Sequence, residues 1–261
     1  MMKNGLMITK CLVLLVLLCG GIARAQESEA ADRDALATNA YRTGDLDTAR
    51  VLWEEVLAEC VDNEDPATRA RLCYNLGNIA LRENRALEGV AWFSASLRLR
   101  PRDEDTWSNL ELARLNAGLE AADRGDLKAT MDRLLGSWTN EESSIFALIG
   151  CLPLALAFAF EALRGGRRAR WLVFGSLGIA VLCATPWIRQ QWLVGGDPVM
   201  VIAKEAPRSR SEPRADAPRV QEFSSGQVLQ RTDQSPGWTE VQDQDGLRGW
   251  LDSEEVFGLN R

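Results

Sequence analysis

The chain has 261 residues, of which 30 are lysine or arginine, 37 are aspartate or glutamate and none is histidine. Without an imidazole it cannot build a Ser-His-Asp or Cys-His catalytic relay, and its six scattered cysteines cannot replace histidine in a zinc site. The net charge of −7 speaks against a nucleic-acid-binding protein, so a binding or structural protein without metal or cofactor is expected.

The first 25 residues have the layout of a secretory signal peptide. Two lysines precede a short apolar run, which is followed by the cleavage motif Ala23-Arg24-Ala25. The run is shorter than the roughly 20 apolar residues that span a bilayer. We therefore expect residues 1–25 to be cleaved and the following domain to be exported. A lipoprotein signal at Cys19 is the alternative, although Leu18 stands before it, where a small residue is usual.

Residues 26–142 are expected to form a helical domain. They are rich in Ala, Leu, Glu and Arg, show no strand-like alternation, and have turn residues at Gly44 and Asn84. With 24 acidic and 14 basic residues, this segment has a net charge of −10. A basic or neutral peptide therefore suits it better as a partner than an acidic one.

One unit of this domain resembles the tetratricopeptide repeat. The residues that match the motif are Leu76, Gly77, Phe93 and Pro101. The unit departs from the motif at Cys73, where Trp is usual, and at Gly89, where Ala is usual. Less complete copies surround it, around Gly44, Ala49 and Trp53 and around Trp107 and Leu110. The resemblance implies stacked helix pairs, capped by a helix expected over 127–135.

The aromatic residues of these repeats are expected to pack in the core; they are Tyr41, Trp53, Trp92, Phe93 and Trp107. By resemblance, the first helices form a partner-binding groove, and the residues expected in it are Arg71, Tyr74, Asn78, Leu81 and Asn109. Asn78 and Asn109 occupy positions that some tetratricopeptide domains use to clamp a C-terminal carboxylate. The lysines that accompany such a clamp are absent here.

Cys60 and Cys73 flank the acidic loop between the first two repeats. An exported domain lies in a compartment that permits disulfides, so a bridge between them would join the two repeats. Two buried thiols are the alternative, and the sequence leaves the choice open.

Two uncharged apolar runs, over 145–160 and 171–188, follow the helical domain. We expect transmembrane helices over 143–163 and 171–192, joined by a loop at 164–170 that holds four arginines. A buried hairpin in a soluble domain is the alternative, but it would normally show polar faces. Cys151 and Cys183 fall within these helices and are expected to pack there.

The signal peptide and the hairpin predict the same topology. Cleavage leaves residue 26 outside the cytoplasm, and one crossing then places the basic loop inside, where arginines belong. A second crossing returns the C-terminus to the outside. We therefore expect a two-pass protein of the bacterial inner membrane, in contact with lipid, with both larger domains on the extracytoplasmic side.

Residues 197–261 are expected to form a small all-β barrel. Strands are expected over 199–202, 227–230, 237–241 and 247–251, with a Pro-, Arg- and Ser-rich loop over 206–219. The pairs Gly237-Trp238 and Gly249-Trp250, with the Asp-Gly turn between them, resemble a bacterial SH3-type domain. Trp238 and Trp250 are either core residues, the commoner case in this fold, or ligand-binding residues.

The whole order of segments resembles the E-type members of the Bat aerotolerance-operon family, including the sequence Trp107-Ser-Asn-Leu-Glu111 after the second repeat. Such proteins are encoded beside MoxR-type ATPases and membrane proteins with von Willebrand factor A domains. The resemblance implies a multidomain, membrane-tethered adaptor, and it supplies no catalytic residues.

We compare three functions for this sequence. The first is an adaptor whose repeat and SH3-type domains bind protein partners of an envelope complex. The second is a peptidoglycan-binding sensor or anchor, because bacterial SH3-type domains often bind the cell wall. An enzyme is disfavoured, since no Gly-rich phosphate loop, CxxC pair or metal-spaced cluster occurs in the sequence.

Overall fold

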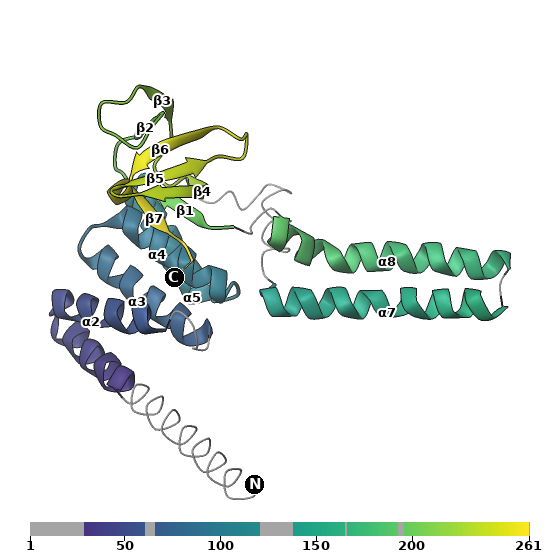
Figure 1. Cartoon of the computed structure of the whole chain (residues 1–261). Helices are drawn as coiled ribbons and strands as arrows, with labels where there is room; N and C mark the ends of the chain where they lie inside the picture. Colours follow the sequence, from purple (N-terminus) through teal and green to yellow (C-terminus); the bar gives the residue numbers. More distant parts are fainter. Residues whose placement is uncertain (1–28, 61–65, 121–137, 165, 193–195, 261) are drawn as a thin grey trace, which may run out of the picture. The chain divides into compact units, whose positions relative to one another are not determined.

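The computed structural model describes residues 29–60, 66–120, 138–164, 166–192 and 196–260 (Figure 1). Helices come first, two long apolar helices follow, and an antiparallel sheet ends the chain, which confirms the expected order of these elements. The contacts divide the chain into two compact units, Met1–Glu64 and Asp65–Arg261. The expected signal peptide and the expected cap at 127–135 lie outside the described residues.

The first unit contains a helix over 29–43 and α2 (Leu46–Glu59). Gly44 joins them with a φ of +89°, a left-handed conformation that glycine adopts without strain. Trp53 is buried, as expected, and its indole N–H donates to Asp34 Oδ1 at 2.8 Å. Its ring also lies against Tyr41, with centroids 5.6 Å apart, although Tyr41 is only half-buried.

Three helices open the second unit: α3 (Pro66–Arg82), α4 (Ala86–Leu99) and α5 (Glu104–Asn116). A left-handed residue, Asn84 with a φ of +58°, turns the chain between α3 and α4. Gly77 lets these two helices approach, because a Cβ atom there would lie 2.7 Å from Phe93 Cε1. Phe93 and Trp92 are buried as expected, whereas Trp107 on α5 is half-buried and donates to the Pro101 carbonyl at 2.9 Å.

The long hairpin consists of α7 (Asn140–Arg164) and α8 (Arg167–Trp192). Because α8 begins at Arg167, three of the arginines expected in a loop lie in its first turn. Small residues face the partner helix: Ala157, Ser176 and Ala180 are buried, and a Cβ atom on Gly150 would lie 2.4 Å from Cys183 Cβ.

The remaining faces of this hairpin are apolar and exposed. The segments Glu141–Leu163 and Trp171–Ile188 are long and apolar enough to cross a membrane, and only 17% and 22% of their apolar windows are buried. A core helix of a soluble domain would be mostly buried, and exposed apolar surface of this extent marks an interaction with lipid or protein. The two apolar helices therefore favour a membrane hairpin.

The C-terminal sheet has seven strands in the order β3-β2-β6-β5-β4-β1-β7, with every neighbouring pair antiparallel. The strands are β1 (Pro198–Val201), β2 (Arg208–Arg210), β3 (Arg219–Glu222), β4 (Val228–Ser235), β5 (Trp238–Gln242), β6 (Arg248–Asp252) and β7 (Val256–Gly258). A short helix, η1 (Ser253–Glu255), connects β6 to β7. The core of the barrel consists of Val199, Val201, Phe223, Leu229, Val241 and Leu251.

The expected loop over 206–219 is partly wrong, because it contains β2 and the first residue of β3. These strands escaped prediction since β2 is three residues long and consists of Arg and Ser, without an apolar alternation. The Asp-Gly turn between β5 and β6 is confirmed: Gly246 has a φ of +85°, and Asp243 Oδ1 accepts from the backbone N–H groups of Asp245 and Leu247, both at 2.9 Å.

Within the second unit, α4 also contacts the barrel. The rings of Trp92 and Phe257 meet edge-to-face with centroids 4.7 Å apart, and Arg98 Nη2 donates to Asn260 Oδ1 at 3.1 Å. All four residues of β1 are buried, including Met200, whose neighbours Val199 and Val201 belong to the barrel core. Both faces of β1 are thus covered, which is unusual for a strand of a small antiparallel sheet.

Candidate functional site

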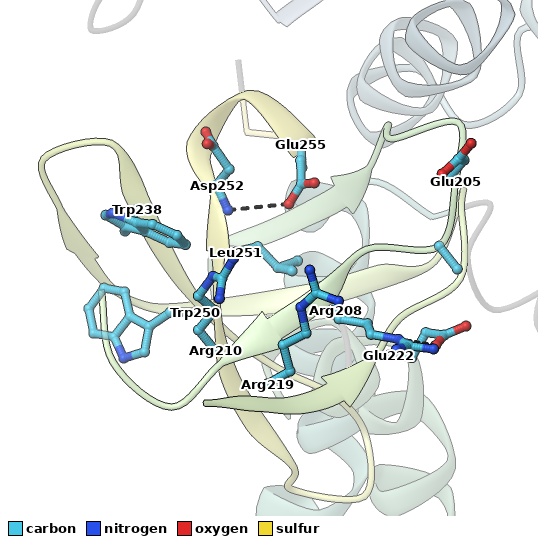
Figure 2. Close-up of a pocket in the computed structure, with 11 residues that line it drawn as sticks. Glu205, Arg208, Arg210, Arg219, Glu222, Trp238, Trp250, Leu251, Asp252 and Glu255 are labelled. Carbon is cyan, nitrogen blue, oxygen red and sulfur yellow. Dashed lines mark hydrogen bonds and ion pairs between the residues drawn. The ribbon is translucent and has the colours of Figure 1, made fainter. Parts of the chain in front are cut away.

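The barrel carries a pocket of about 490 Å³ on the outer side of its core (Figure 2). The pocket lies among β2, β3, the start of β5 and the junction of β6 with η1. Its lining residues are Glu205, Ala206, Arg208, Arg210, Arg219, Glu222, Trp238, Trp250, Leu251, Asp252 and Glu255. It therefore combines two indole rings with several charged groups of both signs.

The strand alternation explains why two tryptophans face this pocket. In β6, Gly249 and Leu251 are buried while Trp250 between them is half-buried, so Trp250 lies on the opposite face from the core. Trp238 is likewise half-buried and opens β5, where it pairs with Asp252, two residues beyond Trp250. Both tryptophans therefore line the pocket with half-buried rings, and their role in binding a ligand stays a prediction.

A close approach of β2 to β6 positions two of the arginines. A Cβ atom on Gly249 would lie 2.2 Å from Ser209 Oγ, and this hydroxyl donates to the Gln221 carbonyl at 3.0 Å. Ser209 is buried on one side of β2, so its neighbours Arg208 and Arg210 lie on the pocket side. Only glycine at position 249 leaves room for this arrangement.

The arginines differ in how far their donors are satisfied. Arg208 Nε donates to Glu222 Oε2 at 2.8 Å, which forms an ion pair within the pocket wall. Arg210 Nη1 donates to the Ala217 carbonyl at 3.0 Å, and its guanidinium carbon lies 6.0 Å from the centroid of Trp238. The guanidinium group of Arg219 has no hydrogen bond or ion pair with any residue of the described part of the chain.

Acidic groups lie on another side of the pocket, where η1 begins. Asp252 caps η1 by accepting from the Glu254 N–H at 3.0 Å, and Glu255 Oε2 accepts in return from the Asp252 N–H at 3.4 Å. Burial, reinforced by the negative charge of Asp252, raises the pKa of the Glu255 carboxyl, against the opposing effects of this hydrogen bond and of Arg210. Figure 2 shows these two acids on one side of Arg210 and Arg219, with the tryptophans at one end.

The groove residues expected on the helical repeats are partly brought together. Asn109 Nδ2 on α5 donates to Tyr74 OH at 3.1 Å and to Asn78 Oδ1 at 3.0 Å, both on α3. Both amide hydrogens of Asn109 are thus directed at neighbouring side chains, and a carboxylate clamp would have to displace one of them. Arg71 and Leu81 lie on the same helix, exposed and half-buried respectively.

Two further sequence predictions concern cysteines and metals. Cys60 and Cys73 are both buried, and their pairing stays a prediction. Within the described ranges, no group of three or more His, Cys, Asp or Glu side chains is arranged to hold a metal ion. Sequence reasoning identified Trp238 and Trp250 but missed the pocket's charged residues, because Arg208, Arg210 and Arg219 lie in the segment interpreted as a loop.

Residues 210–256 match the family model of the bacterial SH3 domain. The match runs from the end of β2 to the start of β7, so it includes most of the pocket and confirms the resemblance inferred from Gly249-Trp250. No curated protein and no solved structure matches the chain. The resemblances to tetratricopeptide repeats and to the Bat family stay predictions.

Proposed function

We propose that the chain is a non-catalytic adaptor of the bacterial inner membrane, in which the helical repeats and the SH3-type domain bind protein partners of one envelope complex. The observation that carries this proposal is the pocket of the SH3-type domain. Its indole and guanidinium groups suit binding, while Glu222 pairs with Arg208, and Asp252 and Glu255 form the capping box of η1. The resemblance to the Bat family favours membrane proteins with von Willebrand factor A domains, and MoxR-type ATPases, as members of this complex.

The length of the chain between membrane and barrel supports a partner near the membrane. Helix α8 ends at Trp192 and β1 begins at Pro198. Six peptide steps span at most about 20 Å when fully extended. The SH3-type domain is therefore restricted to a layer next to the bilayer, where it meets membrane proteins and their short extramembrane segments.

The proposed topology follows from the basic segment between the two apolar helices. Positive residues are retained on the cytoplasmic side, which assigns Arg164 to Arg170 to that side. The ends of the hairpin, and with them the repeats and the SH3-type domain, then lie on the extracytoplasmic side. In this arrangement the two modules are available to the same envelope complex.

Photo-crosslinking in intact membranes tests the adaptor proposal. A photoreactive amino acid at Ala206, which is exposed and lines the pocket, should form adducts with a membrane or envelope protein. The matched control is the same residue at Leu247, which is exposed on the turn before β6 and does not line the pocket. Absence of protein adducts at Ala206, or equal adducts at both positions, would contradict the proposal.

A peptidoglycan-binding sensor or anchor is the second candidate, and the match to the bacterial SH3 domain favours it. Incubation of the full chain in detergent with purified peptidoglycan separates the two candidates. Retention that Arg219→Gln abolishes would support binding to the wall. Lack of retention, together with protein adducts at Ala206, would support the adaptor.

A further inference from the structure

The charges of the pocket do not cancel within it. Arg208 and Glu222 form an ion pair, which leaves Arg210 and Arg219 as the cations available to a ligand. A guanidinium group has five N–H donors, and Arg210 uses one of them on the Ala217 carbonyl. Arg219 uses none within the described part of the chain. Two arginines thus present unused donors to the same pocket, beside the face of Trp238.

Two acids of the pocket also lack an ion pair. Asp252 and Glu255 are held in place by the capping box, and neither forms an ion pair with a described residue. Burial is the main cause of the raised pKa of the Glu255 carboxyl; repulsion by the charge of Asp252 raises it further, and the charge of Arg210 opposes the shift. A positive ligand group would relieve this repulsion. The capping hydrogen bonds fix these carboxylates where such a group would meet them.

We propose that this pocket binds a protein segment that carries both an acidic and a basic side chain, with its carboxylate at Arg210 and Arg219 and its cation at Asp252 and Glu255. The indole faces of Trp238 and Trp250 would contact the apolar atoms between the two charges. This inference rests on the proposed function and specifies the partner of the same site.

A protein segment whose charges all have one sign fits the pocket less well. A purely acidic segment would satisfy the arginines but would meet Asp252 and Glu255, and like charges at close range are costly. A purely basic segment would meet Arg210 and Arg219 instead. Because Asp252 and Glu255 lie on one side of the arginines in Figure 2, both charges of a mixed segment can be satisfied together.

The short connection between α8 and β1 favours a protein segment over another mixed-charge ligand of the envelope. A domain whose first strand begins at most about 20 Å from the end of α8 reaches the short extramembrane loops and tails of membrane proteins. The stem peptides of peptidoglycan also carry both charges, but they belong to a layer outside the membrane. We therefore assign the pocket to a membrane-proximal protein segment and treat a muropeptide as an outcome of the test.

Titration of the full chain in detergent with four blocked peptides of equal length tests this assignment. One peptide carries Lys and Glu around a central Tyr; the others replace Glu by Gln, Lys by Gln, or both. The mixed-charge peptide should bind about tenfold more tightly than either singly neutral peptide, which corresponds to about 1.4 kcal/mol for each charge-assisted contact. Equal affinities, or no binding of any peptide at about 5 mM, would overturn the assignment.

Substitutions in the pocket test which of its residues binds each charge of the peptide. Arg219→Gln leaves Arg210 in place, so it should lower the affinity for the mixed peptide toward that of the Gln-for-Glu peptide and should not weaken the Gln-for-Glu peptide further. Asp252→Asn keeps a capping side chain. It should lower the affinity for the mixed peptide toward that of the Gln-for-Lys peptide. Arg248→Gln, an exposed arginine outside the pocket, is the control and should change nothing. If either pocket variant weakens all four peptides equally, the assignment of charges is wrong.

Two outcomes separate this inference from the proposed function. Protein adducts at Ala206 without a charge preference among the peptides would leave the adaptor intact and reject the mixed-charge ligand. A soluble muropeptide that binds more tightly than the mixed-charge peptide, without protein adducts at Ala206, would reject both the protein segment and the adaptor.

Discussion

At the scale of single residues, Gly249 determines how closely β2 approaches β6. We predict that Gly249→Ala lowers the free energy of unfolding of the SH3-type domain by about 1–3 kcal/mol, because the new methyl group would overlap Ser209. Ser209 cannot move away freely, since its hydroxyl is bonded to the backbone of Gln221. Thermal unfolding of the detergent-solubilised chain measures the effect.

Gly258→Ala is the matched control for this change. Gly258 also lies in a strand, β7, but a Cβ atom there would meet no other atom within 4 Å. We expect its melting temperature to stay close to that of the unmodified chain. Equal destabilisation by both substitutions would show that the loss of glycine itself, rather than the contact with Ser209, is responsible.

Glu255 predicts a pH dependence of stability. Its folded-state pKa is raised, so the folded chain holds this proton more tightly than the unfolded chain. The resulting stabilisation is present below the ordinary pKa of a glutamate and is lost as the pH rises through the raised pKa. Glu255→Gln keeps a capping side chain and should remove this loss. As the pH rises from acidic to neutral, the melting temperature of the variant should therefore rise relative to that of the unmodified chain. A difference between the two melting temperatures that does not change with pH would contradict the prediction.

The tryptophans of the candidate site could be predicted from the sequence, whereas its arginines could not. The tryptophans could be identified because Gly-Trp pairs next to an Asp-Gly turn are a local pattern. Their orientation also follows from alternation, since Leu251 belongs to the core and Trp250 must then face outward. The arginines could not be placed, because β2 and β3 are formed by pairing with each other and with distant β6 rather than by a local preference.

At the scale of elements, two glycines on neighbouring helices should respond in opposite ways. Gly77→Ala should destabilise the contact of α3 with α4 by about 1–3 kcal/mol, since its Cβ atom would lie 2.7 Å from the Phe93 ring. Gly89→Ala should be neutral or stabilise by up to about 1 kcal/mol. Its Cβ atom would find ordinary contacts at 3.5 Å and beyond, and alanine is the better helix former. The two melting temperatures measure this difference, and destabilisation by Gly89→Ala would contradict it.

The sequence was sufficient to predict these two helices but not the first turn of α8. The existence of α3 and α4 followed from composition and from turn residues such as Asn84, which the structure places in a left-handed conformation. The start of α8 did not follow, because its arginines were assigned to a loop from their charge alone. Arginine is a good helix former, and the apolar run that follows it continues the same helix.

At the scale of the whole molecule, the proposed topology predicts where the C-terminus lies. A reporter enzyme that is active only outside the cytoplasm, fused after Arg261, should be active. The same reporter fused after Gly166, between the two apolar helices, should be inactive. Activity of the second fusion with inactivity of the first would reverse the orientation of the hairpin.

The short connection between α8 and β1 predicts a response to added length. Insertion of about 20 Gly and Ser residues between Gly195 and Gly196 should weaken photo-crosslinking from position 206 to a membrane-embedded partner, because the barrel would explore a larger volume. A chain with the same insertion after Arg261 serves as the control. Unchanged crosslinking would show that the connection does not restrict the barrel to its partner.

This connection also sets how strong the pocket's own affinity needs to be. A partner that diffuses in the same membrane as the hairpin shares a thin layer with the barrel, so encounters take place in two dimensions at an effective concentration that short tethers raise to the millimolar range. A pocket that binds an isolated peptide with a Kd of only about 1 mM would then be half occupied inside the assembly. Such an assembly would exchange its members rapidly and would disperse when extracted into detergent.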